Sequence, residues 1–220
     1  MQYNIRENLL QIREEIAPYK PNIIAVTKYF DESAMISAYE AGIRDFAESR
    51  AVEAVKKIES LPDEIGKNST FHFIGHLQTN KVKLVVGHFD YIHSVDSLKL
   101  AQEISKEAEK IGKSQNILIQ VNNACEEQKF GFSKDEVFDV FEDILKLPSI
   151  KLSGLMNMAP LGAEESELDR LFEEIYRIRN ELQSRFGCEL KEISMGMSQD
   201  YKIAVRHGAT MLRIGRKLFE

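Results

Sequence analysis

The sequence predicts an α/β protein, a single-domain (β/α)8 barrel spanning residues 1–220 with an extra N-terminal helix. Three observations support this prediction. Eight short apolar segments of strand length recur along the chain, helical patterns lie between them, and no Pro/Gly/Ser-rich linker interrupts the alternation. At 220 residues the chain is near the lower size limit for this fold. An open doubly wound sheet is the alternative, but the residues after the first strand, KYFDES, lack the Gly-rich turn of a dinucleotide site.

The chain begins with an amphipathic, charged pattern that predicts a helix over residues 3–16 and lacks the apolar run of a signal peptide. The longest helical pattern, residues 164–186, repeats Leu, Phe and Ile every three or four positions. The predicted strands are all rich in Val, Ile, Phe and Leu, and they cover residues 23–27, 44–48, 70–75, 91–96, 116–122, 151–158, 190–197 and 210–215.

Several helix ends carry their own sequence signals. Asp31 is placed to accept a hydrogen bond at the start of the helix after the first strand, and Gly42 is placed to end that helix. Ser133 followed three residues later by Glu136 predicts a capping box. Asp96 is expected to cap the helix in SVDSLKLAQEI.

Composition excludes several function classes. The net charge of −6 and the absence of a long Lys/Arg run disfavour nucleic acid or an anionic membrane as the main partner. No apolar run approaches the ~18–20 residues of a membrane span. Cys125 and Cys188 do not predict a disulfide framework, and His76, His88 and His93 are too scattered to predict a metal site. We therefore expect a cytoplasmic protein with free thiols.

In a barrel of this kind, chemistry takes place where strands end and βα loops begin. The residues at the predicted strand ends are polar, small and of mixed charge: Lys28, Glu48, Ser49, Gly75, His76, Asp96, Asn122, Met156, Asn157, 194–198 and 213–215. Lys28, at the end of IIAVT, allows two interpretations. It is either a solvated surface lysine or an amine that forms a Schiff base with a carbonyl.

Two glycine-containing segments favour the second interpretation. SMGMS (194–198), with a helix expected to begin near Ser198, and RIG (213–215) end the last two strands. Backbone N–H groups and hydroxyls after these strands form the usual phosphate site of this fold. A lysine on strand one facing such a site predicts pyridoxal 5′-phosphate held as a Schiff base on Lys28. Met195 and Met197 are expected to pack around the ring and the barrel mouth.

Four blocks of the sequence, AVTKYF, FHFIGHLQTNK, GLMNMAP and SMGMSQDYKIAVRHGATMLRIG, resemble the signature blocks of the YggS/PROSC-type pyridoxal phosphate homeostasis proteins. The resemblance covers nearly the whole chain in the same order. It implies a fold-type III barrel like the N-terminal domain of alanine racemase, with Arg213 facing the pyridine nitrogen and Lys28 carrying the cofactor. It also implies that the phosphate is held by Ser194, Met195, Gly196, Met197, Ser198 and Gly215. The family is regarded as acting in vitamin B6 homeostasis without an established catalytic reaction.

The chain departs from the family pattern at two positions. Ser49 stands where members commonly have Asn, and Arg216 replaces the Thr of Arg-Ile-Gly-Thr, although its guanidinium can pair with phosphate. His76 is a candidate ligand contact, whereas His72, inside a strand, is interpreted as structural. Lys129 resembles a lysine that members keep, and is either a secondary aldehyde acceptor or a solvated loop charge.

The expected arginine at the pyridine nitrogen bears on whether the protein is an enzyme. An arginine keeps this nitrogen unprotonated and weakens the cofactor as an electron sink. Racemases of this fold class tolerate the arrangement but add a second domain, whereas this chain ends five residues after Gly215. We therefore predict a monomeric carrier that buffers the cofactor or delivers it to apo forms of enzymes that use it. A minimal amino-acid racemase or lyase is one alternative, and a phosphosugar-type barrel enzyme with a structural Lys28 is another.

Overall fold

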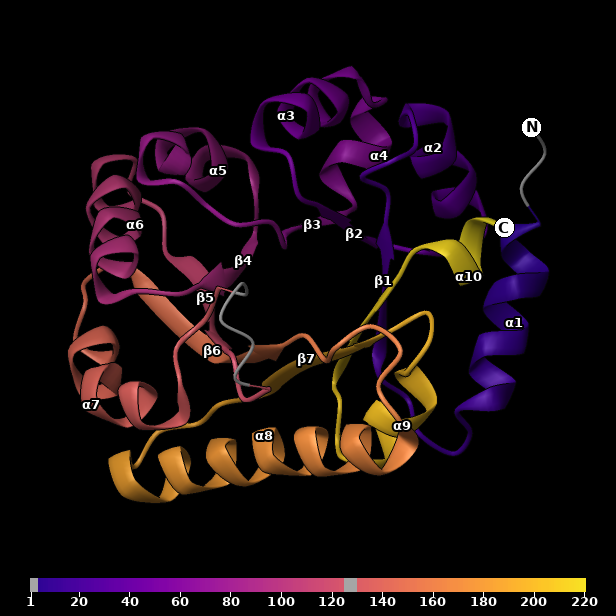
Figure 1. Ribbon diagram of the computed structural model, residues 1–220. Coiled ribbons are helices and arrows are strands. Elements are labelled where there is room, and N and C mark those ends of the chain that lie inside the picture. Colours follow the sequence, from indigo (N-terminus) through magenta and orange to yellow (C-terminus); the bar gives the residue numbers. More distant parts are fainter. Residues whose placement is uncertain (1–3, 125–129) are drawn as a thin grey trace.

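A computed structural model describes residues 4–124 and 130–220 and confirms the predicted barrel (Figure 1). The strands form a closed parallel sheet in the order β1 to β8, with β8 pairing back onto β1. All eight predicted strands are present, with ends shifted by no more than two residues: β1 Asn22–Val26, β2 Asp45–Glu48, β3 Thr70–Phe73, β4 Tyr91–Val95, β5 Gln115–Val121, β6 Ile150–Asn157, β7 Glu192–Met197 and β8 Met211–Ile214.

The helices surround the barrel as an outer layer (Figure 1). They are α1 Ile5–Glu15, α2 Glu32–Glu40, α3 Ala51–Ser60, α4 Asp63–Lys67, α5 Val82–His88 after the short 3-10 turn η1 Thr79–Lys81, α6 Leu98–Lys110, α7 Lys134–Leu145, α8 Glu165–Phe186, α9 Tyr201–Arg206 and α10 Arg216–Phe219. Among the described residues, none of these helices combines the length and the apolar character needed to cross a lipid bilayer.

Most of the predicted helix caps are confirmed. The Asp31 carboxylate accepts a hydrogen bond from the N–H of Ala34 (3.3 Å), and Ser133 and Glu136 form the reciprocal capping box. The prediction for Asp96 is wrong, because the Ser97 hydroxyl caps α6 instead by accepting from Leu100 N–H. Asp96 is hydrogen-bonded to His76 instead.

The alternation of side chains along each strand separates two cores. Outward-facing residues join the helices in one large hydrophobic core. Inside the barrel, Ile24, Ala47 and Met211 form only a small apolar cluster. Much of the remaining buried interior is polar and consists of His72, His93, Ser194 and Arg213. Burying polar groups inside the barrel costs free energy unless each group is hydrogen-bonded. These four side chains therefore need hydrogen-bond partners within the barrel.

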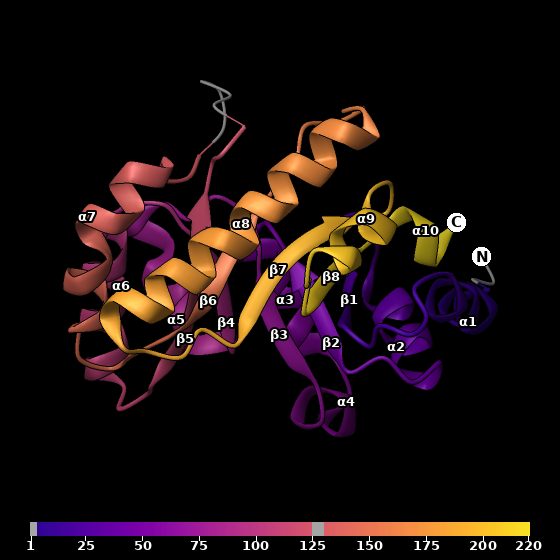
Figure 2. The same cartoon turned by 90° about the horizontal axis from the view of Figure 1, so that it is seen from below.

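The N-terminal helix α1 lies beside the C-terminal helix α10 (Figure 2). The Asn8 side chain donates to the carbonyl of Leu218 (3.0 Å). Glu15 accepts from the Tyr201 hydroxyl, which lowers the pKa of this carboxyl to about 2, and it forms an ion pair with Lys202 (3.0 Å). These contacts join α1 to α9 and α10, the two helices that follow the last two strands.

Candidate functional site

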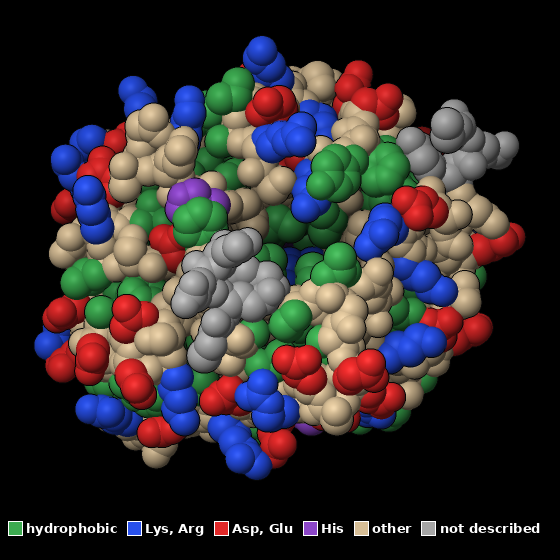
Figure 3. Space-filling model, viewed as in Figure 1, with side chains coloured by type: hydrophobic (Ala, Val, Ile, Leu, Met, Phe, Trp, Pro, Cys, Tyr) green, Lys and Arg blue, Asp and Glu red, His purple; other side chains and the backbone are tan. Residues whose placement is uncertain are grey.

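The carboxyl ends of the strands open on one face of the barrel, the mouth. Figure 3, which looks onto this face, shows a hollow near its middle, with hydrophobic side chains along parts of the edge. β1 and β7 both pair with β8, and Arg213 on β8 is opposite Ile24 of β1 and Met197 of β7. The sheet therefore brings the predicted lysine and both glycine-containing segments to adjacent positions at the mouth.

Lys28 lies in a tight turn just beyond the end of β1. The N–H of Phe30 donates to the carbonyl of Thr27 (2.9 Å), which closes the turn around Lys28 and Tyr29. The side chain of Lys28 is half-buried, and its Nζ lies 5.1 Å from the centre of the Tyr29 ring. The amine is thus held at the mouth and remains accessible from it.

A buried ion pair supports this turn from below. Lys57 of α3 donates to Glu48 Oε1 (2.6 Å) and to the carbonyl of Thr27 (2.9 Å). The Thr27 hydroxyl donates to the same Glu48 oxygen (2.7 Å). Glu48 is almost completely buried, so these hydrogen-bond partners replace the water that its carboxylate oxygens lose. The role of Lys57 has no signal in the sequence, because nothing in the pattern of an amphipathic helix separates this lysine from its solvated neighbours.

Replacing Lys57 with methionine is expected to lower the free energy of unfolding by about 1–3 kcal/mol, because the buried Glu48 carboxylate and the Thr27 carbonyl lose a charged donor. Urea denaturation followed by circular dichroism measures the change. Lys56→Met is the matched control, since Lys56 is the exposed neighbour on the same helix. Its expected effect is within about 0.5 kcal/mol. Equal unfolding midpoints for the two variants would show that the ion pair contributes nothing.

Arg213 lies inside the barrel directly below the mouth. Its side chain donates through Nη1 to Ser194 Oγ (2.6 Å) and through Nη2 to the carbonyl of Asn157 (2.8 Å). Burial lowers the pKa of the guanidinium to about 10, and the nearby Asp200 carboxylate opposes the shift. Arg213 therefore stays a cation at neutral pH, and the guanidinium has further N–H donors besides these two.

Ser194 does not have the role predicted for it. Its hydroxyl is fully buried and bonds to Arg213 and to Nδ1 of His93 (2.9 Å), so its side chain belongs to the barrel interior and not to a phosphate site. Nε2 of His93 is hydrogen-bonded to Nδ1 of His72 (2.9 Å), and Nε2 of His72 is hydrogen-bonded to Oδ1 of Asp45 (2.9 Å). Burial holds the pKa of His93 well below its usual value, with His72 and Arg213 adding to the effect, so this ring is neutral at pH 7.

At Gly196, near the end of β7, the backbone lies close to α9 and β8. Its φ of +90° is a conformation that favours glycine. A Cβ at this position would lie 2.7 Å from Ala204 Cβ and 2.8 Å from a methyl group of Leu212. Only a residue without a side chain fits at this point between β7, α9 and β8.

The loop after Gly196 is held by polar contacts. Met197 N–H donates to Asp200 Oδ1 (2.5 Å), and this turn delays α9, which begins at Tyr201 and not near Ser198 as predicted. Ser198 Oγ accepts from the N–H of Lys217 (3.3 Å), which joins the loop to α10. The N–H groups of Leu218 and Phe219, early in α10, both donate to the carbonyl of Gly215 (2.9 and 3.3 Å). The loop after Gly196 and the start of α10 are therefore in direct contact.

The remaining predicted residues lie in different places. Met195 is fully buried and follows the inward-facing Ser194, so its side chain faces the outer core and not the mouth. Met197 is only partly buried at the end of β7. Arg216 is exposed at the start of α10, beside the loop that contains Ser198. Lys129 lies outside the described residues.

His76 and Ser49 lie at the ends of β3 and β2, to one side of the mouth. His76 Nδ1 bonds to Asp96 Oδ2 (3.0 Å), and its ring stacks on that of Phe130 with centroids 3.6 Å apart. Gly75 lets the backbone approach Ser49 closely, because a Cβ on Gly75 would lie 2.1 Å from the Ser49 carbonyl oxygen. His76 and Ser49 line a small cleft of about 350 Å³.

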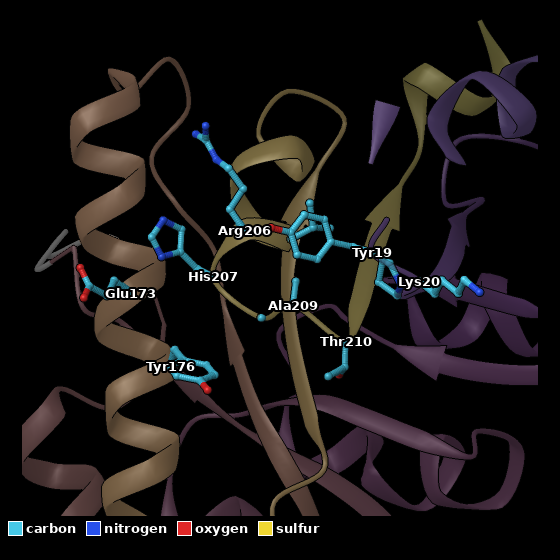
Figure 4. A pocket seen from close by; sticks show the side chains of 11 residues that line it. Tyr19, Lys20, Glu173, Tyr176, Arg206, His207, Ala209 and Thr210 are labelled. Atoms are coloured by element: carbon cyan, nitrogen blue, oxygen red, sulfur yellow. The ribbon is translucent and has the colours of Figure 1, made fainter. Parts of the chain in front are cut away.

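A larger cleft, of about 700 Å³, is at the opposite end of the barrel (Figure 4). It lies between α8 and the loops that precede β1 and β8, with Tyr19 and Tyr176 among its lining residues. Two of its basic side chains are paired, His207 with Asp169 (2.7 Å) and Arg206 with Glu165 (2.6 Å). Since strand carboxyl ends face away from this cleft, we assign the chemistry to the mouth.

Comparison with known proteins identifies close relatives. The chain matches the family described as alanine racemase, N-terminal domain, over residues 2–219. It is 39% identical over 208 residues to the pyridoxal phosphate homeostasis protein of Synechocystis sp., with 94% of each chain covered. The protein of the same name from Escherichia coli K12 is 33% identical, with 98% of this chain and 96% of that protein covered.

Solved structures agree with the sequence comparison. PipY of Synechococcus elongatus, solved with pyridoxal phosphate bound, has a TM-score of 0.88 and 35% identity, and the match covers 99% of this chain and 100% of that one. Alanine racemase of Clostridium difficile has a TM-score of 0.81 at 16% identity, and the match covers 98% of this chain but 56% of the racemase. The second likeness shows a shared barrel fold only.

Proposed function

The chain belongs to the alanine racemase N-terminal domain family and, within it, to the pyridoxal phosphate homeostasis proteins, and from this we propose that it binds pyridoxal 5′-phosphate as a Schiff base on Lys28 and buffers or delivers it in the cytoplasm. The observation that carries the proposal is the adjacency of Lys28, the Gly196 loop and Arg213 around one mouth. An amine, a phosphate site and a side chain to partner the pyridine nitrogen are the groups that proteins commonly supply to this cofactor.

The residues of the mouth would share the binding as follows. When bound, the cofactor supplies an aldehyde for an amine and a phosphate for backbone donors. Lys28 provides the amine, and the turn closed by Thr27 keeps it at the mouth. The loop of Gly196 and Ser198 together with the start of α10 would hold the phosphate, with Arg216 beside it. Arg213, a buried cation, would keep the pyridine nitrogen unprotonated.

The rim of the mouth supports delivery to another protein. Among the large hydrophobic side chains that the structure describes, the three most exposed are Leu161 (81%), Tyr29 (74%) and Phe130 (54%). They belong to three different βα loops, so all three surround the mouth. We propose that these three side chains contact the protein that receives the cofactor. The proposed partners are apo forms of pyridoxal-phosphate-dependent enzymes.

Transfer of the cofactor tests the proposal directly. The loaded protein, freed of excess cofactor, is expected to restore activity to an apo aminotransferase that depends on pyridoxal phosphate. In deuterated water, D- or L-alanine incubated with the loaded protein is expected to gain no deuterium at the α-carbon. Deuterium uptake at an enzymatic rate, lost in Lys28→Ala, would instead identify a racemase or lyase.

A rim variant separates delivery by contact from simple release. Leu161→Ser is expected to slow transfer to the apoenzyme severalfold while leaving release to a small-amine trap unchanged. The control is Leu10→Ser, because Leu10 is 53% exposed on α1, away from the mouth. If Leu161→Ser and Leu10→Ser transfer the cofactor at the same rate as the unmodified protein, the rim plays no part in delivery.

A further inference from the structure

A continuous chain of side-chain hydrogen bonds crosses the barrel interior from Asp45 to Arg213. Its four links join Asp45 to His72, His72 to His93, His93 to Ser194, and Ser194 to Arg213, each between 2.6 and 2.9 Å. The middle residues are on β3, β4 and β7, and His93 and Ser194 are 101 residues apart in sequence. Asp45 begins β2, so the chain runs from the amino end of the barrel to just below the mouth.

We propose that Asp45, His72 and His93 are positioning residues that act through Ser194 to fix the orientation and donor strength of Arg213. The inference rests on the proposed function, which places Arg213 beside the pyridine nitrogen. It adds that the electronic state of that nitrogen is set in part by a carboxylate at the far end of the barrel.

The chemistry of the two ends fixes the direction of the chain. An arginine has only donors, so Arg213 donates to Ser194 Oγ. An ionised carboxylate has only acceptors, so His72 donates to Asp45 through Nε2. A neutral His72 with its proton on Nε2 must accept at Nδ1, and His93 must then donate to it through Nε2.

The last link follows from the same reasoning. A neutral His93 with its proton on Nε2 accepts at Nδ1, and among the described residues the hydrogen bonded there is that of the Ser194 hydroxyl. Every donor therefore points from Arg213 toward Asp45, and both histidines have the Nε2–H tautomer. The alternative is an imidazolium at His72, which would still donate to Asp45 but would reverse the His72–His93 and His93–Ser194 links and place the His93 proton on Nδ1.

The packing around the histidines keeps their rings in place. His72 stacks on Tyr91, with centroids 4.9 Å apart and planes at 14°, and meets His93 edge-on at 78°. Both histidines are fully buried, so water does not compete for their nitrogens. Among the described residues, the other ionisable groups near these side chains include Tyr91, Asp90 and Glu192 on the histidine side and Asp200 near Arg213. Hydrogen bonds in such a chain polarise one another, and a change at Asp45 should therefore reach Arg213.

Asp45→Asn tests the proposal with little change of shape, because an amide replaces a carboxylate whose side chain is 18% exposed. Nitrogen-15 spectra of the cofactor-free protein at pH 7 report the tautomers. The unmodified protein is expected to have Nε2–H on both histidines. Since an amide can also donate to His72, the variant is expected to populate the Nδ1–H tautomer of both rings and to shift the Arg213 Nε–H signal. In the loaded protein, the pH titration of the imine absorption band is expected to move by several tenths of a pH unit.

Glu192→Gln is the matched control. Glu192 is also a carboxylate near the amino end of the barrel, but it bonds to Thr210 and is not part of the hydrogen-bond chain from Asp45 to Arg213. This variant is expected to leave the tautomers, the Arg213 signal and the imine titration unchanged. An Nδ1–H tautomer in the unmodified protein, an unmoved Arg213 signal in Asp45→Asn, or equal shifts in both variants would overturn the proposal. The histidine tautomers and the Arg213 signal are measured without cofactor. If the protein fails to bind pyridoxal phosphate, the proposed function is refuted, and these two measurements still test the hydrogen-bond chain from Asp45 to Arg213.

Discussion

Lys28→Ala is expected to abolish the imine absorption band of the loaded protein completely and to leave the fold intact. The band requires an amine joined to the cofactor aldehyde, and Lys28 is the amine that the turn after β1 holds at the mouth. The fold should survive because the turn is closed by backbone atoms of Thr27 and Phe30 and supported by Glu48 and Lys57. Borohydride reduction of the unmodified protein followed by peptide mapping should place the adduct on Lys28.

A second lysine near the mouth provides the control for this experiment. Lys81 lines the small cleft beside His76, at the ends of β2 and β3. Lys81→Ala is expected to keep the full band and the same adduct. An undiminished band in Lys28→Ala, or an adduct mapped to another lysine, would refute the assignment of the Schiff base to Lys28.

Gly196→Ala is expected to lower the free energy of unfolding by about 2–6 kcal/mol and to weaken binding of the phosphate group. A φ of +90° costs a residue with a side chain about 1–3 kcal/mol. The new methyl group would also lie 2.7 Å from Ala204 Cβ and 2.8 Å from Leu212. Relieving this overlap adds about 1–3 kcal/mol and displaces the loop that leads to Ser198. Urea denaturation measures the stability, and titration with inorganic phosphate or pyridoxal phosphate measures the binding.

Gly187→Ala separates the two costs of this substitution. Gly187 ends α8 with a φ of +63°, and a Cβ there would meet no atom within 4 Å. In this control, only the unfavourable backbone conformation destabilises the protein. The free energy of unfolding is expected to fall by about 1 kcal/mol, and phosphate affinity is expected to stay unchanged. Equal losses of stability in the two variants would mean that the close contact of Gly196 with Ala204 and Leu212 adds nothing to the cost of the substitution.

The barrel and the position of its mouth could be predicted from local patterns. Short apolar segments such as IIAVT and TFHFIG have the length and residue types of strands, and the helical repeats between them require parallel pairing. The sequence predicts the position of Lys28 because this residue directly follows one of these segments, and strand ends converge at one face in a barrel. It predicts the glycine segments for the same reason, since glycine marks a close backbone approach.

Where several neighbouring residues can perform the same local role, the sequence pattern led to errors. Asp96 and Ser97 are both good helix caps, and the path of the chain leaving β4 gives the cap to Ser97. Asp96 then pairs with His76. The sequence pattern predicts one phosphate site for Ser194, Met195, Met197 and Ser198, yet strand alternation turns the side chains of Ser194 and Met195 to opposite faces.

The identity of the partners across the barrel required the closed structure. A strand pattern shows that His72 faces one side of a sheet, but closure of the barrel decides that His93, Ser194 and Arg213 are next to one another inside it. The same holds for Glu48 and Lys57, whose pairing depends on how α3 packs beside β1 and β2. Secondary structure and strand ends follow from interactions between residues close in sequence, so the amino-acid pattern records them. Hydrogen bonds between residues far apart in sequence depend on strand register and barrel closure, which no local pattern records.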